Sequence, residues 1–295
     1  STLDRDQNVT FTVTVTPSNG CGPNVSDSVI YKINGAPTVS SGSSVTICET
    51  QQSYVLNGSS TFTDSVVWSH TGSGTLDNPN ALAPTYTFSP TDIATGSVTF
   101  TLRGKKLNCT DAVSMMTVTI RKNPVANAGT AQTICQGQTV YLTGLAPNNG
   151  SVSWSKSSGS GVFNNTTTLT PNYVSSVSDT GTITFTLTAQ PQSPCAVPSV
   201  ATTTVTIIPK PTASISAINP QICEGSTYTV NSASATNYES LEWTASNTGG
   251  SFTGGNTLSP TYTPGANDIN NGSVKLTLTA KRNSPCTLDA IAEVT

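Results

Sequence analysis

Short runs of alternating apolar and polar residues recur along the whole chain, separated by Gly, Pro, Asn and Ser. The clearest runs span residues 98–102, 183–187 and 274–278. Alternation with a period of two places every second side chain on one face of a strand. Many short runs of this kind, bounded by turn residues, are typical of two-sheet antiparallel sandwiches. Since no segment shows the spacing and caps of a useful helix, we expect an all-β protein.

An internal repeat organises these runs. The dipeptide Ile-Cys, followed by an acid or amide, recurs at intervals of 87 and 88 residues, and a Trp follows each Cys after 19 or 20 residues. A Tyr, an Asp before a Gly, an alternating strand and a second Cys come next. The members are Cys48, Trp68, Tyr86, Asp92 and Cys109; Cys135, Trp154, Tyr173, Asp179 and Cys195; Cys223, Trp243, Tyr262, Asp268 and Cys286. A fixed period of this length predicts tandem domains.

The repeat also predicts the domain boundaries. Residues 1–35 match the last two strands of a repeat and are expected to be the C-terminal part of a preceding one. Three immunoglobulin-like repeats follow, at 36–122, 123–209 and 210–295, joined at Pro37, Pro124 and Pro209/Pro211. Because these junctions are short and contain Pro, we expect limited flexibility between repeats and an elongated rod.

Each repeat has predicted core and corner positions. Trp68, Trp154 and Trp243 stand where the third strand should be, so their indoles are expected to fill the space between the sheets. The Tyr of each repeat falls in a turn-rich segment. The Asp-to-Gly corner before the penultimate strand is expected to cap turn amides.

Composition narrows the function classes. Only 9% of the residues are charged, against roughly 25% in an ordinary soluble domain, and 91 are Ser or Thr. The net charge of −3 gives no electrostatic reason to expect nucleic acid as a partner. Because no run of about 18 apolar residues is present, no membrane insertion is expected in this segment.

The repeat motifs resemble those of a known class. The Ile-Cys-acid/amide segment, the strand-three Trp, the Tyr with its Asp and Gly, and the late Cys are similar to the Ig-like or PKD-like tandem repeats of giant Bacteroidota cell-surface adhesins, of the SprB type that acts in gliding motility. The chain lacks the Trp-x-Phe-Gly-Asp-Gly turn of PKD domains, and its cysteines lie elsewhere than in antibody domains. The resemblance implies a cell-surface location and export by the type 9 route.

Seven cysteines indicate an oxidising compartment rather than a metal site. No Cys-x-x-Cys pair occurs, and one His cannot complete a zinc set, so neither metal nor cofactor is expected. Pairing within repeats would join Cys48 to Cys109, Cys135 to Cys195 and Cys223 to Cys286, leaving Cys21 unpaired.

Strand order favours a different pairing. The first Cys precedes the second strand and the late Cys lies between the last two strands, so the two fall at opposite ends of one sandwich, roughly 20 to 26 Å apart. A disulfide needs Cα atoms within about 7 Å. We therefore prefer bonds across the junctions, Cys48 with Cys195 and Cys135 with Cys286, which leave Cys21, Cys109 and Cys223 unpaired here. The alternative within repeats stays open if the strand order differs.

Other residues that could carry chemistry are sparse. His70 follows a core Trp and is expected in an exposed loop. The lone carboxylates of Asp92, Asp179 and Asp268 suit a corner cap better than a calcium site, which needs six to eight oxygen ligands. The pair Glu239 and Glu242 occurs in one repeat. The weak basic cluster, expected to be solvated loop charge, comprises Arg103, Lys105, Lys106, Lys281 and Arg282.

Modification motifs add two candidates. Ser28 and Ser65 stand in Asp-Ser-Val triplets. These resemble the O-glycosylation motif of exported Bacteroidota proteins, so the resemblance makes both serines candidate acceptors. Chance matches are equally expected in so Ser-rich a chain.

The sequence as a whole predicts a non-enzymatic stalk segment of a long extracellular adhesin or fibre, stiffened by disulfides. Its expected partners are neighbouring repeats of the same chain and a surface polysaccharide or abiotic surface. Two alternative functions remain open. The chain could be a set of carbohydrate-binding accessory repeats of a secreted polysaccharide-degrading enzyme, or a self-assembling surface filament whose strand edges pair between chains. Tyr238 is a loop aromatic that does not recur, which disfavours sugar stacking.

Overall fold

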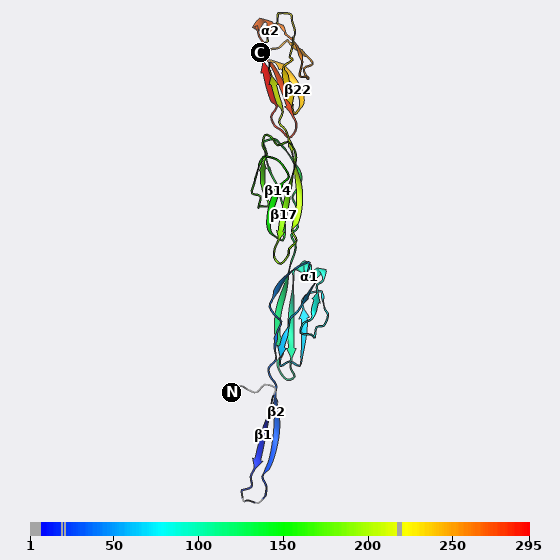
Figure 1. The fold of residues 1–295 in the computed structure, drawn as a ribbon, viewed down its shortest axis with the longest axis vertical. Coiled ribbons are helices and arrows are strands. Elements are labelled where there is room, and N and C mark those ends of the chain that lie inside the picture. Colours follow the sequence, from blue (N-terminus) through cyan, green and yellow to red (C-terminus); the bar gives the residue numbers. More distant parts are fainter. Residues whose placement is uncertain (1–6, 19, 21, 217–219) are drawn as a thin grey trace. The chain divides into compact units, whose positions relative to one another are not determined.

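A computed structural model describes residues 7–18, 20, 22–216 and 220–295 (Figure 1). By compactness the chain divides into two units. The first unit comprises Ser1–Asn123 with Pro191–Val197, and the second comprises Pro124–Gln190 with Pro198–Thr295. Three tandem all-β sandwiches follow one N-terminal hairpin, as the alternation pattern predicts.

The hairpin opens the first unit. Its strands β1 (Gln7–Val15) and β2 (Val25–Ile33) pair antiparallel, with Phe11 opposite Val29. Phe11 and Tyr31 are both 58% exposed, although they belong to one apolar face. These are the penultimate and last strands that the repeat register predicts for residues 1–35.

The first sandwich also lies in the first unit. One sheet has the order β4-β11-β10-β7 and faces a second sheet of order β5-β9-β8, with the pair β3-β6 beside them. The strands are β3 (Thr38–Ser40), β4 (Val45–Cys48), β5 (Ser53–Val55), β6 (Ser59–Thr61), β7 (Ser65–His70), β8 (Thr75–Leu76), β9 (Thr85–Thr87), β10 (Ser97–Lys105) and β11 (Ala112–Arg121).

The second sandwich repeats this order as β12-β18-β17-β14 over β13-β16-β15. A bridge between Asn127 and Leu145 stands in place of the β3-β6 pair. The strands are β12 (Gln132–Cys135), β13 (Thr139–Tyr141), β14 (Asn149–Lys156), β15 (Val162–Asn164), β16 (Asn172–Val174), β17 (Gly181–Pro191) and β18 (Ser199–Ile208).

The third sandwich contains β22-β25-β26, β20-β24-β23 and the pair β19-β21. Its described residues form no strand at 220–223, the segment that matches β4 and β12. The strands are β19 (Thr212–Ile215), β20 (Tyr228–Thr229), β21 (Ala233–Thr236), β22 (Tyr238–Ala245), β23 (Ser251–Thr253), β24 (Thr261–Thr263), β25 (Leu276–Arg282) and β26 (Ala290–Val294).

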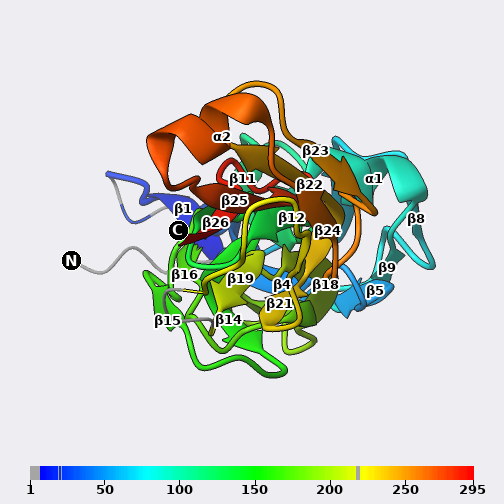
Figure 2. The same cartoon turned by 90° about the horizontal axis from the view of Figure 1, so that it is seen from above.

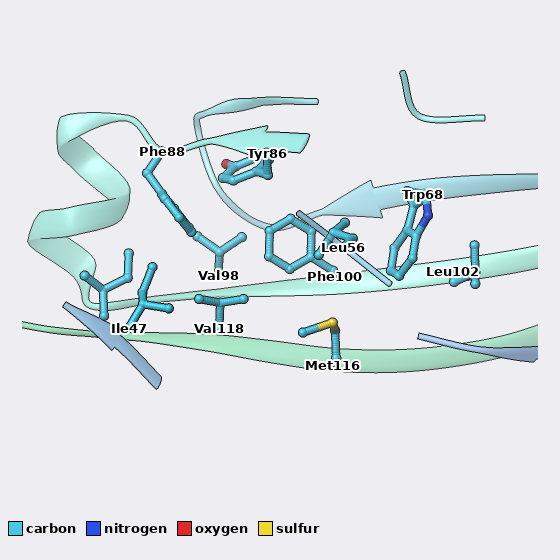
Figure 3. Close-up of a cluster of buried hydrophobic side chains, with 11 residues drawn as sticks. Ile47, Leu56, Trp68, Tyr86, Phe88, Val98, Phe100, Leu102, Met116 and Val118 are labelled. Atoms are coloured by element: carbon cyan, nitrogen blue, oxygen red, sulfur yellow. The ribbon is translucent and has the colours of Figure 1, made fainter. Parts of the chain in front are cut away.

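The alternating strands place their apolar positions in the core. In β10, Val98, Phe100 and Leu102 are fully buried, and Figure 3 shows them on one side of the strand, with Tyr86 facing Phe100. Trp68 is 3% exposed and donates its indole N–H to the carbonyl oxygen of Ala81 across 3.1 Å. Trp154 and Trp243 are buried in the same way, with indole N–H donors 3.0 and 2.9 Å from Thr168 and Thr257.

The expectation of no capped helix is wrong in two repeats. Six-residue helices, α1 (Pro90–Thr95) and α2 (Ala266–Asn271), occupy the Asp-to-Gly corner, and both views draw α2 close to the strands of the third sandwich (Figures 1 and 2). Ser89 and Asp92 form a capping box, and Gly96 ends α1 with a φ of 84°. A side-chain cap of this kind supports a single helical turn that is too short to show apolar periodicity.

Two further expectations are corrected. His70 is the last residue of β7, not an exposed loop residue, and its partly buried ring lies 4.8 Å from the ring of Tyr86. Tyr86, Tyr173 and Tyr262 lie on the short strands β9, β16 and β24 rather than in turns. Short strands embedded among turn residues gave the sequence no clear alternation.

Candidate functional site

Each Ile-Cys segment of the first two sandwiches forms an edge strand beside the last strand of its own repeat. β4 runs parallel to β11, so that Ile47 lies opposite Ile120 and Cys48 opposite Arg121. Ile47 and Ile120 are 4% and 5% exposed, which shows that the Ile anchors the segment in the core. The following Cys is therefore held at the end of the sheet.

A disulfide joins this strand end to a loop of the next repeat. Cys48 bonds to Cys195, with Cα atoms 4.9 Å apart and a sequence separation of 147 residues. Cys195 lies between β17 and β18, in a turn closed by its N–H donating to the carbonyl of Gln192 across 2.9 Å. Arg121 also donates to the side-chain oxygen of Gln192. The loop 191–197 thus belongs to the first compact unit.

The second junction repeats the arrangement within the second unit. Cys135 ends β12 opposite Ile208 and bonds to Cys286, with Cα atoms 4.8 Å apart. All four bonded cysteines are buried, between 5% and 8% exposed. These are the two pairs that strand order favours over pairing within repeats.

The acid or amide after the Ile-Cys of the first two repeats has a role that the sequence did not reveal. The Glu49 carboxylate accepts from the backbone N–H of Asn123, the third residue after Ile120, across 2.9 Å. In the second repeat the Gln136 side chain accepts from the N–H of Lys210, the equivalent residue, across 3.3 Å. The motif Ile-Cys-(Glu/Gln) therefore combines a core anchor, a crosslink and a clasp on the linker. The recurrence of an oxygen acceptor at this position was the available signal.

The remaining cysteines differ in placement. Among the described residues, Cys109 and Cys223 are free thiols; Cys109 is partly buried and Cys223 is exposed. Cys21 lies outside the described residues.

The repeated Tyr and Asp form a buried pair in every sandwich. Asp92 accepts from the Tyr86 hydroxyl across 2.9 Å and from the backbone N–H groups of Ser73, Gly74 and Ser89 at 2.7, 3.0 and 2.9 Å. Asp179 repeats this with Tyr173, and Asp268 accepts from Tyr262 across 2.7 Å. The carboxylate therefore caps turn amides, as predicted, and in addition ties them to a core tyrosine.

These environments shift the titration of both partners. Burial, followed by the hydrogen bond to the Asp carboxylate, raises the pKa of Tyr86 and of Tyr173 to about 12. Burial would raise the pKa of Asp92, but hydrogen bonds from the Ser89 and Ser73 amides and the Tyr86 hydroxyl outweigh it, so the net shift is downward. At physiological pH the pair is a neutral phenol and a carboxylate, which suits a structural role.

Charged residues outside these sites form surface ion pairs. Lys106 lies 3.1 Å from Asp64, Arg103 3.2 Å from Asp111, and Arg282 3.0 Å from Asp289. Glu242 is paired with Lys281 at 2.8 Å and shares exposed positions of β22 with Glu239. The structure therefore does not gather the predicted basic cluster or the two glutamates into a cleft.

Ser28 and Ser65 are exposed, on β2 and β7. In the ranges that the structure describes, no group of three or more His, Cys, Asp or Glu side chains could hold a metal ion. No helix in those ranges has the length and apolar character to cross a membrane.

Comparison with known proteins gives the fold class. No protein-family model matches the chain, and no curated protein matches it. Among solved structures, the human CDH23 EC21-23 crystal structure is 14% identical with a TM-score of 0.50, covering 88% of this chain and 100% of that one. An I-band fragment of titin is 12% identical with a TM-score of 0.48, covering 88% and 98%. Protocadherin Gamma B7 extracellular cadherin domains 1-4 are 12% identical with a TM-score of 0.43, covering 98% and 83%.

The chain is thus a tandem array of Ig-like or cadherin-like β-sandwich domains. The similarity is structural and distant, and it concerns the fold. What separates this array from a plain row of sandwiches is the pair of disulfides that link successive repeats.

Proposed function

We propose that the chain is a non-enzymatic, load-bearing segment of an extracellular cell-surface adhesin or fibre. The observation that carries this proposal is the pair of disulfides, each joining an edge strand of one repeat to a loop of the following repeat. Disulfides persist in oxidising environments, which supports an extracellular location. The neighbouring repeats of the same chain are then the first partners of each sandwich.

The two disulfides interleave along the sequence. Cys135 lies inside the loop closed by Cys48 and Cys195, and Cys195 lies inside the loop closed by Cys135 and Cys286. Tension applied to the unfolded chain would cross from Cys48 to Cys195, run back to Cys135 and cross to Cys286. The remaining sequence would carry little load, because this is the shortest covalent path. Residues 49–134 and 196–285 would therefore be protected from full extension even after their sheets separate, whereas residues 135–195 would carry the load.

Uncovered surfaces support a continuation of the array. Tyr31 and Ile33 are 58% and 37% exposed, whereas their equivalents Val118 and Ile120 are buried. At the third sandwich, Ile222 is 43% exposed, whereas its equivalent Ile47 is 4% exposed. Further repeats of the same kind would cover both surfaces. In the proposed fibre, the segment spaces a binding region from the cell surface, as in the gliding adhesins of Bacteroidota that its motifs resemble. The ligand is then a surface polysaccharide or an abiotic surface, and the protein is exported by the type 9 route.

Single-molecule pulling on the two chain ends tests the proposal. With the disulfides intact, the unfolded chain should extend to roughly 40 nm, and after reduction to roughly 100 nm, at about 3.3 to 3.6 Å per residue. The variant Cys135→Ser with Cys286→Ser should give an intermediate length. An unfolded length that is the same with and without reductant would contradict the load-bearing proposal. Specific binding of an isolated glycan to these repeats would favour the carbohydrate-binding rival instead.

A further inference from the structure

The N-terminal hairpin matches the last two strands of the complete sandwiches residue by residue. Val9 lies opposite Tyr31, as Val98 lies opposite Val118 in the first sandwich and Ile183 opposite Val205 in the second. The motif Val-Thr-Phe-Thr-Val at 9–13 fixes the same alignment in sequence. Residues 31–34 of the hairpin therefore take the places of residues 118–121 and 205–208.

Those places carry an edge strand in both complete examples. β4 lies parallel on residues 118–121 and β12 lies parallel on residues 205–208. In the part of the chain that the structure describes, β2 pairs with β1 and its other edge is open. An open edge presents unpaired backbone N–H and C=O groups to an incoming strand.

Cys109 stands beside this edge in the same way as the bonded late cysteines stand beside theirs. Its N–H donates to Lys106 across 3.0 Å, as that of Cys195 does to Gln192 across 2.9 Å. Its sulfur lies 4.0 Å from the carbonyl oxygen of Gly35, and the Cys286 sulfur lies 4.0 Å from that of Pro209, the equivalent residue. The thiol is therefore positioned where both other repeats form a disulfide.

The hairpin end is also held against this loop. Asn34 donates its side-chain N–H to the carbonyl oxygen of Leu107 across 3.0 Å. The open edge and the thiol thus belong to one local arrangement within the first unit.

We propose that residues 31–34 and Cys109 form a binding site for an extended strand with the sequence Ile-Cys-(Glu/Gln), supplied by another repeat of this kind in the same protein. The strand adds to β2 in parallel, its Ile covers the apolar face at Tyr31 and Ile33, and its Cys bonds to Cys109. The acid or amide that follows takes the role of Glu49 by accepting from the N–H of Ala36, which is equivalent to Asn123. This inference rests on the proposed function and extends it to a defined recognition site.

The covalent step is a thiol–disulfide exchange. The Cys109 thiolate attacks the sulfur of the incoming Cys in a mixed disulfide with a small thiol. The new disulfide forms as the old one breaks, and the small thiol leaves with the electron pair and takes up a proton. The oxidant is therefore a low-molecular-weight disulfide.

A peptide copying residues 43–50, with its Cys activated as a thiopyridyl disulfide, provides the test. The reporter is the whole chain carrying Cys21→Ser, in which Cys109 and Cys223 are the free thiols. In the ladder of β4 on β11, the N–H of Glu49 donates to the carbonyl of Arg121, so residues 45, 47 and 49 direct their N–H groups at the neighbouring strand. The control is the same peptide with V45P, because Pro removes one of these donors and leaves Ile, Cys and Glu in place. Peptide mapping by mass spectrometry over time measures the rate of disulfide formation with the peptide at each thiol.

The expected result is a reaction at Cys109 about tenfold faster for the matched peptide than for V45P, with equal rates for the two peptides at Cys223. Slower hydrogen exchange at the amides of residues 31–34 after coupling should accompany it. Equal rates for both peptides at Cys109, or unchanged exchange there, would overturn the inference. An oxidised dimer linking Cys109 of one copy to Cys223 of another would also overturn it, because the occupant would then be a second copy. The pulling experiment on the two existing disulfides does not involve Cys109, so this binding site can fail its test while the load-bearing proposal passes its own.

Discussion

Tyr173 donates its hydroxyl to Asp179 across 2.5 Å, although the two side chains come from a strand and from a corner that follows it. Tyr173 is fully buried and Asp179 is 4% exposed. The same carboxylate accepts from the backbone N–H groups of Ser160 and Ser176 at 2.7 and 2.8 Å. One buried charge therefore fixes a strand, a loop and a corner of the sandwich at once.

Replacing this carboxylate should destabilise the second sandwich. We expect Asp179→Asn to lower the free energy of unfolding by about 2 to 3 kcal/mol, because charge-assisted hydrogen bonds are lost and a buried amide N–H₂ gains no acceptor. Tyr173→Phe should cost about 1 to 2 kcal/mol, since it removes one of these donors. Denaturant unfolding measures both. The exposed neighbour Thr180 provides the control: a loss for Thr180→Ala as large as that for Asp179→Asn would contradict the assignment.

Alkaline titration should distinguish the buried tyrosines from the exposed ones by the pH at which each phenol ionises. Burial and the Asp carboxylate raise the pKa of Tyr86 and Tyr173 from 10.0 to about 12. A raised folded-state pKa gives stabilisation that is fully present below pH 10 and is lost as the pH rises toward 12. Phenolate absorbance should therefore show these tyrosines un-ionised until the sandwiches unfold in this range. Ionisation of all eight tyrosines near pH 10 in the folded protein would contradict the prediction.

Acid should act on the other member of the pair. The pKa of Asp179 lies well below its ordinary value of 3.8, because the Tyr173 hydroxyl and the Ser176 and Ser160 amides outweigh the opposing effect of burial. A lowered folded-state pKa gives stabilisation that is present above pH 3.8 and is lost as the pH falls further. The contribution of Asp179 to the thermal unfolding temperature should thus change little with pH above pH 5 and fall steeply below pH 4. In Asp179→Asn the steep part should shrink, and an unchanged acid profile would argue against the pair as its source.

Much of the fold was accessible from sequence because its signals repeat. The alternating runs, the Trp positions and the separation of early and late cysteines each recur in register, so that chance matches could be set aside. Cys135 and Cys286 could be paired from strand order because a disulfide tolerates only a short Cα separation. These inferences depend on the backbone path rather than on side-chain detail.

The parts that were missed depend on side-chain detail. His70 lies on β7 because its ring packs on Tyr86 and Phe100, a contact that no local pattern encodes. The helix α1 is one capped turn, too short for periodicity. Glu49 is close in sequence to Cys48, but its partner Asn123 is distant, so its role became visible only with both strands in place.

The clasp formed by Glu49 gives a local prediction. Glu49→Ala should speed hydrogen exchange at the Asn123 amide by about tenfold to hundredfold, because a hydrogen bond to a charged acceptor is worth roughly 1.5 to 3 kcal/mol. Glu49→Gln should keep most of the protection, since Gln136 performs the same function in the next repeat. Exchange measured by NMR on the intact disulfide-bonded chain resolves the amide. Equal protection in all three proteins would show that the side chain is dispensable there.

The loop that contains Gly161 lies close to the buried side chain of Tyr173. A Cβ on Gly161 would lie 2.2 Å from the carbonyl oxygen of Val174 and 2.7 Å from the Tyr173 hydroxyl oxygen, so any side chain would push the loop off the buried pair. Gly181 offers a matched control, because its φ is 75° but no heavy atom lies within 4 Å of its Cβ position. Gly181→Ala should cost about 1 to 2 kcal/mol through backbone strain. Gly161→Ala should cost more, about 3 kcal/mol, since it also breaks buried hydrogen bonds. Equal losses in denaturant unfolding would mean that the loop can move away from Tyr173 without penalty, and that the carboxylate does not hold it in place.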